Sequence, residues 1–116
     1  MGQAIDAEQI SMLVDGTGVE GVMPILDAYW ESNDQLIAQL KDALAAGDTN
    51  AVATTAHGLK GSSANLGATL MAERAREIEL AAKGNDLDAA RAACAKLDDD
   101  IAAVRQAFDE ILATKA

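Results

Sequence analysis

His57 is the one histidine of the sequence, and Lys60 follows it three residues later. A neutral imidazole ring is a competent nucleophile near neutral pH, because one of its two nitrogens keeps a free lone pair. An ammonium group one helical turn away would stabilise negative charge on a group attached to that ring. The pair therefore suits nucleophilic capture of a negatively charged group.

Two glycines, Gly58 and Gly61, lie beside this pair within a segment that the sequence predicts to be helical. Each costs a helix about 0.5 to 1 kcal/mol relative to alanine, so helix stability does not explain them. Gly61 is predicted to point about 180° away from the buried side of the helix, where a bundle has no neighbouring helix. Its missing side chain would leave room for a molecule that approaches from outside. For Gly58, close packing against another helix explains the glycine equally well.

The helix that carries these residues is predicted to span residues 49–66, with Asp48 and Thr49 as capping residues and Gly67 in a left-handed conformation at its end. At about 100° per residue, His57 lies about 140° from the centre of the buried stripe, so we expect it to face water. The predicted buried stripe consists of Val52, Ala56, Leu59, Ser63 and Leu66. The residues predicted to share the face of His57 are Asn50, Ala53, Gly61 and Ala64.

The segment from Ala56 to Ala68, which reads AHGLKGSSANLGA, closely resembles the signature of histidine-containing phosphotransfer domains. In that signature the histidine is followed by an apolar residue at +2, lysine at +3, glycine at +4 and a Leu-Gly pair near +9 and +10. Every one of these positions matches, and the helical plan of the chain also agrees with the family. The resemblance implies a helical bundle whose histidine carries a phosphoryl group between the aspartates of receiver domains.

The resemblance also assigns roles to individual residues. It implies that His57 is phosphorylated on a ring nitrogen, that Lys60 helps to neutralise the phosphoryl group and that Gly61 leaves room for the receiver domain. The expected partners are response-regulator receiver domains and hybrid sensor kinases, with Mg²⁺ bound by the receiver and no metal or cofactor on this chain. The predicted docking surface consists of Gly61, Ala64, Ala53, Asn50 and Gly58.

The rest of the chain predicts the helices that must hold this segment in place. A short first helix begins at Asp6 and ends at Gly16 and Gly18, a long second helix covers residues 19–46, and a fourth covers residues 68–83. A fifth begins at Leu87 and repeats apolar residues in steps of three and four. Because the connections are short, we expect an all-α, antiparallel up-down-up-down four-helix bundle with an additional short N-terminal helix, forming one domain over residues 1–116. The apolar positions of the fifth helix are Leu87, Ala90, Cys94, Leu97, Ile101, Val104, Phe108 and Ile111.

Composition excludes several classes of function. Nineteen acidic residues against nine basic ones give a formal charge of −10, which disfavours binding to nucleic acid. No apolar run is long enough for a membrane span, and a single cysteine with a single histidine cannot complete a zinc site. The sequence contains no glycine-rich phosphate loop, so we predict a phosphocarrier without ATP-dependent kinase activity of its own. We expect a cytoplasmic monomer.

Several other residues allow more than one interpretation. Tyr29 and Trp30 are adjacent, so both cannot be fully buried in one amphipathic helix, and one of them is a candidate for the docking surface. Arg74 and Arg76 are candidates for its edge, although a solvated face explains them better. The acidic run of residues 98–100 is interpreted as a solubilising surface.

Two alternatives remain open at the level of the sequence. A non-catalytic helical scaffold, or a module that dimerises through its fifth helix, would have the same fold but would leave His57 and Gly61 unexplained. A domain of a larger hybrid kinase would have the same chemistry. The sequence does not identify the kinase, the receivers, the signal or the direction of net phosphate flow.

Overall fold

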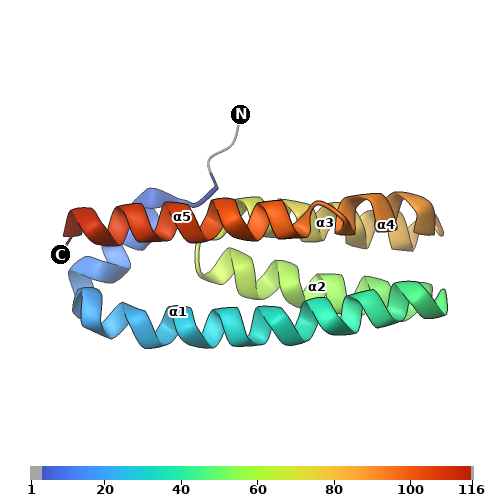
Figure 1. The fold of residues 1–116 in the computed structure, drawn as a ribbon, viewed down its shortest axis with the longest axis horizontal. Helices are drawn as coiled ribbons and strands as arrows, with labels where there is room; N and C mark the ends of the chain where they lie inside the picture. Colours follow the sequence, from blue (N-terminus) through green and yellow to red (C-terminus); the bar gives the residue numbers. More distant parts are fainter. Residues whose placement is uncertain (1–3, 116) are drawn as a thin grey trace.

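The computed structural model describes residues 4–115, and these form helices with no strand among them (Figure 1). The all-α class predicted from the sequence is confirmed. In chain order the helices are α1 (Ala7–Ala46), α2 (Thr49–Asn65), α3 (Thr69–Lys83), α4 (Leu87–Cys94) and α5 (Leu97–Lys115).

The long α1 is divided at Gly18, as the glycine pattern predicted. Gly18 has φ 77° and ψ 162°, which is not a helical conformation, and the chain changes direction there (Figure 1). The segment before Gly18 is the expected short N-terminal helix, capped by the carboxylate of Asp6, which accepts a hydrogen bond from the backbone N–H of Gln9. Pro24 lies inside the following segment without a second break.

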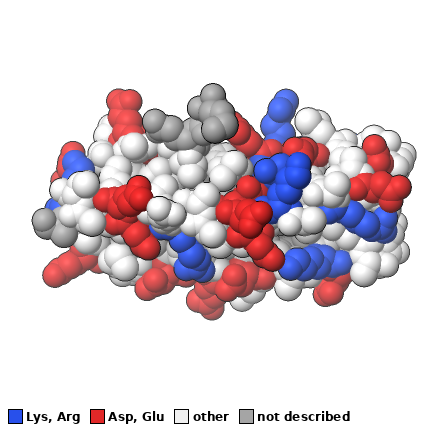
Figure 2. Space-filling model, turned by 45° about the horizontal axis from the view of Figure 1, so that its top comes forward, with Lys and Arg blue, Asp and Glu red and all other residues white. Residues whose placement is uncertain are grey.

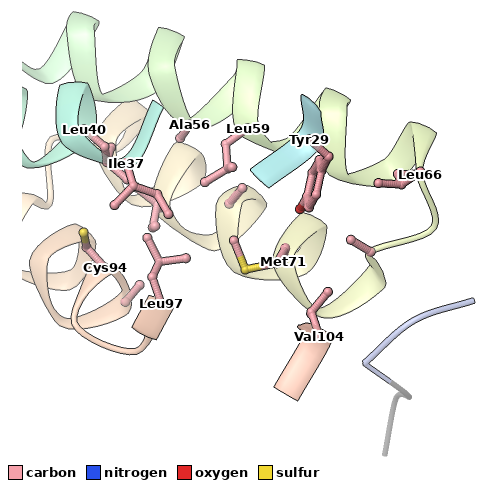
Figure 3. Packing of buried hydrophobic residues seen from close by; sticks show 14 of the residues in the cluster. Tyr29, Ile37, Leu40, Ala56, Leu59, Leu66, Met71, Cys94, Leu97 and Val104 are labelled. Atoms are coloured by element: carbon pink, nitrogen blue, oxygen red, sulfur yellow. The ribbon is translucent and has the colours of Figure 1, made fainter. Parts of the chain in front are cut away.

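The helices surround one core, in which α1 is next to α2, α2 is next to α3, and α3 and α1 both contact α5. The short connections make consecutive long helices antiparallel, so the predicted up-down-up-down bundle is confirmed (Figure 1). Figure 3 shows Leu59 of α2 and Met71 of α3 pointing toward one another, with Ile37 of α1 and Leu97 of α5 meeting farther along the core. The seam between α2 and α3 therefore lies across the bundle from the seam between α1 and α5.

The prediction of one continuous helix after Leu87 was wrong. The chain makes a tight turn between α4 and α5, where the N–H of Lys96 donates to the carbonyl oxygen of Ala93 at 3.1 Å. Beyond the turn Leu97 and Val104 are buried as predicted, whereas Ile101 and Ile111 are only half-buried. At the C-terminal end Leu112 is buried, four residues after Phe108, in place of Ile111. Cys94 and Phe108 lie in the core, as predicted.

The interpretation of the acidic run as a solvated surface was wrong for one of its members. Asp98 and Asp99 are exposed, but Asp100 is buried. It accepts two hydrogen bonds from Arg74, from Nε at 2.6 Å and from Nη2 at 3.3 Å. Arg74 therefore joins α3 to α5 instead of bordering a docking surface, whereas Arg76 is exposed.

Candidate functional site

The third predicted helix is α2, and it presents its two faces as expected. All five residues of the predicted stripe are buried, whereas the side chain of His57 is 66% exposed. The carboxylate of Asp48 accepts a hydrogen bond from the N–H of Ala51 at one end of the helix. At the other end Gly67 has φ 76°, and the N–H of Ala68 donates to the carbonyl oxygen of Ser63 at 2.8 Å. Both ends of the helix are thus fixed, which holds His57 on a rigid element.

A buried glutamate of α3, Glu79, lies directly beside His57. Its side chain is 5% exposed, and its Oε2 atom is 2.9 Å from Nδ1 of His57. Lys60 donates to Oε1 of the same carboxylate at 2.8 Å, and Lys83 lies with Nζ 3.1 Å from Oε2. One carboxylate therefore holds one imidazole ring and two ammonium groups at the seam between α2 and α3.

The cations around Glu79 keep this carboxyl group ionised. The hydrogen bond from Lys60, with smaller contributions from Lys83 and His57, lowers the pKa of Glu79 to about 2, although burial acts in the opposite direction. Glu79 is thus a carboxylate at neutral pH and has no proton to donate. Nδ1 of His57 must therefore carry the hydrogen of their shared bond, which leaves the lone pair of a neutral ring on Nε2.

The residues predicted to surround His57 all lie on its face of α2. Asn50, Gly58, Gly61 and Ala64 are exposed, and Ala53 is half-buried. A Cβ atom added to Gly61 would meet nothing within 4 Å, so packing inside this chain does not require a glycine there. A Cβ atom added to Gly58 would meet Cδ2 of Leu36 at 3.8 Å, an ordinary contact. Close packing therefore explains neither glycine.

Two depressions flank α2. On the α3 side, a hollow of about 260 Å³ is lined by His57, Glu79 and Lys83 together with Ala53 and Thr54. On the α1 side, a groove of about 330 Å³ is lined mainly by uncharged side chains. The lining residues of this groove are Ile25, Ala28, Tyr29, Ser62, Asn65 and Leu66.

Charge is also distributed unevenly around the bundle. Acidic side chains are spread along the whole length of the face shown in Figure 2, which suits a chain of charge −10. By contrast, α2 contains no aspartate or glutamate between Thr49 and Asn65. The surface around His57 is therefore supplied by a helix free of acidic residues.

Glu79 and Lys83 were not identified from the sequence. A signal for Glu79 was present, because it lies four residues after Ala75 and three before Ala82, which are apolar residues at helical spacing in the predicted fourth helix. A glutamate at a position of that kind needs a partner, and Lys83 follows one turn later. What the sequence could not show is that α3 places this carboxylate against the helix of His57.

The two adjacent aromatic residues lie in different environments. Tyr29 is buried, and its hydroxyl group is 2.7 Å from Oγ of Ser63 beneath α2. Burial raises the pKa of Tyr29 to about 12. Trp30 is half-buried between α1 and α5, with its ring centroid 6.2 Å from that of Phe108. The structure thus places Trp30 at the seam opposite His57, away from the predicted docking surface.

Two further searches concern residues 4–115 only. Within that range no group of three histidine, cysteine, aspartate or glutamate side chains is arranged to hold a metal ion. None of the helices in the same range combines the length and the hydropathy that crossing a bilayer requires.

Comparisons with known proteins agree with this geometry. The family model described as the Hpt domain matches residues 24–107. Among solved structures, the chain is similar to histidine-containing phosphotransfer protein B from Pseudomonas aeruginosa PAO1, with a TM-score of 0.84 and 29% sequence identity over 100% of both chains. A search of the curated proteins with this sequence finds no match. The matched range includes α2 and α3, and so the whole His57 cluster.

Proposed function

Since the chain belongs to the Hpt domain family and is a histidine phosphotransfer intermediate of a phosphorelay, we propose that His57 is the residue that carries the phosphoryl group. The observation that carries this assignment is the bond between Nδ1 of His57 and the buried carboxylate of Glu79. It fixes the ring on a rigid helix and leaves Nε2 free for reaction.

The transfer step follows from this arrangement. Nε2 of His57 attacks the phosphorus of an aspartyl phosphate on a receiver domain, an Nε2–P bond forms, and the P–O bond to the aspartate breaks. The aspartate leaves with the electron pair as a free carboxylate. Because the ring keeps its proton on Nδ1, it becomes positively charged, and the carboxylate of Glu79 stabilises that charge. The reverse step passes the phosphoryl group to another receiver along the same path.

The docking surface that we propose is the exposed face of α2 around His57. Its members are those predicted from the sequence: Gly61, Ala64, Ala53, Asn50 and Gly58. Small side chains let the receiver's backbone approach the ring, and the absence of acidic residues from α2 avoids repulsion with the acidic residues that hold Mg²⁺ on a receiver. The uncharged groove between α1 and α2 continues this surface on one side.

We further propose that the protein acts as a monomeric phosphocarrier in the cytoplasm. Receiver domains and hybrid sensor kinases are its partners, as for Hpt domains generally. It carries no ATP-dependent kinase activity, and Mg²⁺ is supplied by the receiver. The positive groups that this chain contributes to the phosphoryl group come from its lysines, so a metal ion of its own is not needed.

The test is transfer from phosphorylated receiver domains in the presence of Mg²⁺, followed by intact mass under neutral conditions. We expect wild type to gain one phosphoryl group, about 80 Da, and His57→Gln to gain none. Nitrogen-15 NMR of the ring should place the new bond on Nε2. If a folded wild-type protein accepts nothing from receivers of the same organism, the phosphocarrier proposal is wrong and a scaffolding role is favoured.

A further inference from the structure

Lys60 and Lys83 both contact the carboxylate of Glu79, although one ammonium group would be enough to balance its charge. Building on the proposed function, we propose that the two lysines have different roles. Lys60 moves to the phosphoryl group, while Lys83 stays on Glu79 and keeps it charged and oriented. Lys83 is then a positioning residue that acts on His57 through Glu79.

The geometry distinguishes the two lysines. Lys60 lies on α2, one turn after His57, and reaches across the seam to Oε1 of Glu79 at 2.8 Å. Lys83 lies on α3, four residues after Glu79, and approaches Oε2, the oxygen that also accepts the bond from His57. Lys60 can therefore leave without disturbing the oxygen that orients the ring, whereas Lys83 cannot.

Charge requires such a division once the phosphoryl group arrives. A phosphoryl group on Nε2 brings between one and two negative charges close to Glu79, about as much as a phosphorylated side chain carries at neutral pH. The nearest ammonium group on the helix of His57 is that of Lys60, which must be shared between the two anions or given to the new one. Glu79 is only 5% exposed, and a buried carboxylate without a cation is costly. When Lys60 departs, the phosphorylated ring of His57 and Lys83 are the two cationic groups left on Glu79, and Lys83 is the one whose charge does not depend on the reaction.

This division predicts a specific failure when Lys83 is lost. With Lys83→Gln, Glu79 would have no ammonium group left once the phosphoryl group takes Lys60, and only the phosphorylated ring would compensate its charge. The pKa of Glu79 would then rise, and the carboxylate would release Nδ1 of His57. Before phosphorylation the variant should differ little from wild type, because Lys60 still holds Oε1.

The experiment is a double-mutant cycle on phosphoryl transfer from a phosphorylated receiver domain. The four proteins are wild type, Lys83→Gln, Glu79→Gln and the double variant. We expect Lys83→Gln to slow transfer about tenfold in the wild-type background and to have no further effect when residue 79 is glutamine. Lys60→Gln should slow transfer in both backgrounds, because Lys60 acts on the phosphoryl group itself. Lys41→Gln, an exposed lysine of α1, is the matched control and should behave as wild type.

A second readout does not depend on rates. Nitrogen-15 NMR should show the hydrogen-bonded Nδ1 proton of His57 in unphosphorylated Lys83→Gln, and its loss in the phosphorylated variant only. If wild type accepts phosphate but Lys83→Gln transfers equally fast, the division of work is wrong while the phosphocarrier role stands. If Lys83→Gln slows phosphoryl transfer just as much in the Glu79→Gln background, Lys83 contacts the phosphoryl group directly and the proposal is overturned. If wild type accepts no phosphate, both proposals fail together.

Discussion

Two opposite seams of this bundle contrast in what they contain. The seam between α2 and α3 holds His57, Glu79 and two lysines, with glycines on the adjoining helix face. The seam between α1 and α5 holds Trp30 against Phe108, with the guanidinium carbon of Arg105 4.1 Å from the centroid of the tryptophan ring. One seam carries a cluster of polar and charged groups, and the other carries aromatic packing. A small bundle can thus keep a polar cluster apart from stabilising aromatic packing by placing the two on different pairs of helices.

The α5 side also contains the ion pair of Arg74 and Asp100, which stabilises the bundle without touching the site. A bidentate pair between largely buried groups depends on both partners, because removing one leaves the other buried and uncompensated. The separation of the two seams can therefore be tested by substitutions that should affect stability alone or transfer alone.

The largest effect is expected from Asp100→Asn. It should lower the free energy of unfolding by about 3 kcal/mol, because Arg74 would keep its charge without its buried partner and with only the exposed Glu77 at 3.4 Å. Urea denaturation followed by circular dichroism measures this. Asp99→Asn, at the exposed neighbouring position, is the control and should change stability by less than about 0.5 kcal/mol. Phosphoryl transfer by the folded Asp100→Asn protein should be unchanged, and a loss of transfer under folding conditions would show that the two seams are coupled.

The next largest effect is a dependence of the free energy of unfolding on pH that arises from Glu79. The pKa of Glu79 is lowered from 4.5 to about 2 in the folded protein. A lowered carboxylate pKa stabilises the folded state above the unfolded value, and this stabilisation is lost as the pH falls from about 4.5 toward 2. Glu79→Gln should therefore flatten the loss of stability in this range, measured by urea denaturation at several pH values. Glu73→Gln, at an exposed position of α3, should lose stability on acidification as wild type does.

Much of this arrangement was predictable from the sequence because it depends on local rules. The buried stripe of α2, the exposure of His57, the break at Gly18 and the left-handed Gly67 all follow from helical periodicity and backbone preferences. These features are determined within one or two turns of a helix. Helical periodicity therefore predicted correctly that His57 lies on the exposed side of its helix.

The features that the sequence did not reveal depend on contacts between helices. Arg74 lies 26 residues from Asp100, and His57 lies 22 residues from Glu79, so neither of these two contacts follows from spacing on one helix. The turn that separates α4 from α5 has no glycine or proline to announce it, since Ala95 and Lys96 are good helix formers. Tertiary packing determined these features, and it buried Asp100, which was predicted to be solvated.

A smaller effect, with opposite signs on stability and binding, is expected at Gly61. Gly61→Ala should raise the free energy of unfolding by about 0.5 to 1 kcal/mol, because alanine is the better helix former and its Cβ meets no neighbour. The same change should weaken receiver binding, and Gly61→Gln should weaken it more. Thermal unfolding and titration calorimetry measure the two quantities. Ala102→Gln adds the same side chain to an exposed position of α5 and should leave binding intact. Unchanged binding by Gly61→Gln would remove Gly61 from the docking surface.

The smallest effect is expected at Trp30, whose fluorescence emission should not change when a receiver docks. Trp30 is the only tryptophan of the chain, so its fluorescence reports the α1 and α5 seam directly when the receiver used has no tryptophan. Saturation with receiver, verified by calorimetry, should leave the emission unchanged, because the docking face lies across the bundle. Arg105→Ala should alter the emission of the free protein, since it removes the cation over the ring. A receiver-induced shift of the emission would mean either that docking reaches α5 or that the two seams are coupled through the core. Asp100→Asn loosens the contact between α3 and α5, so it should reduce a shift that is transmitted through the core and leave a shift caused by direct docking.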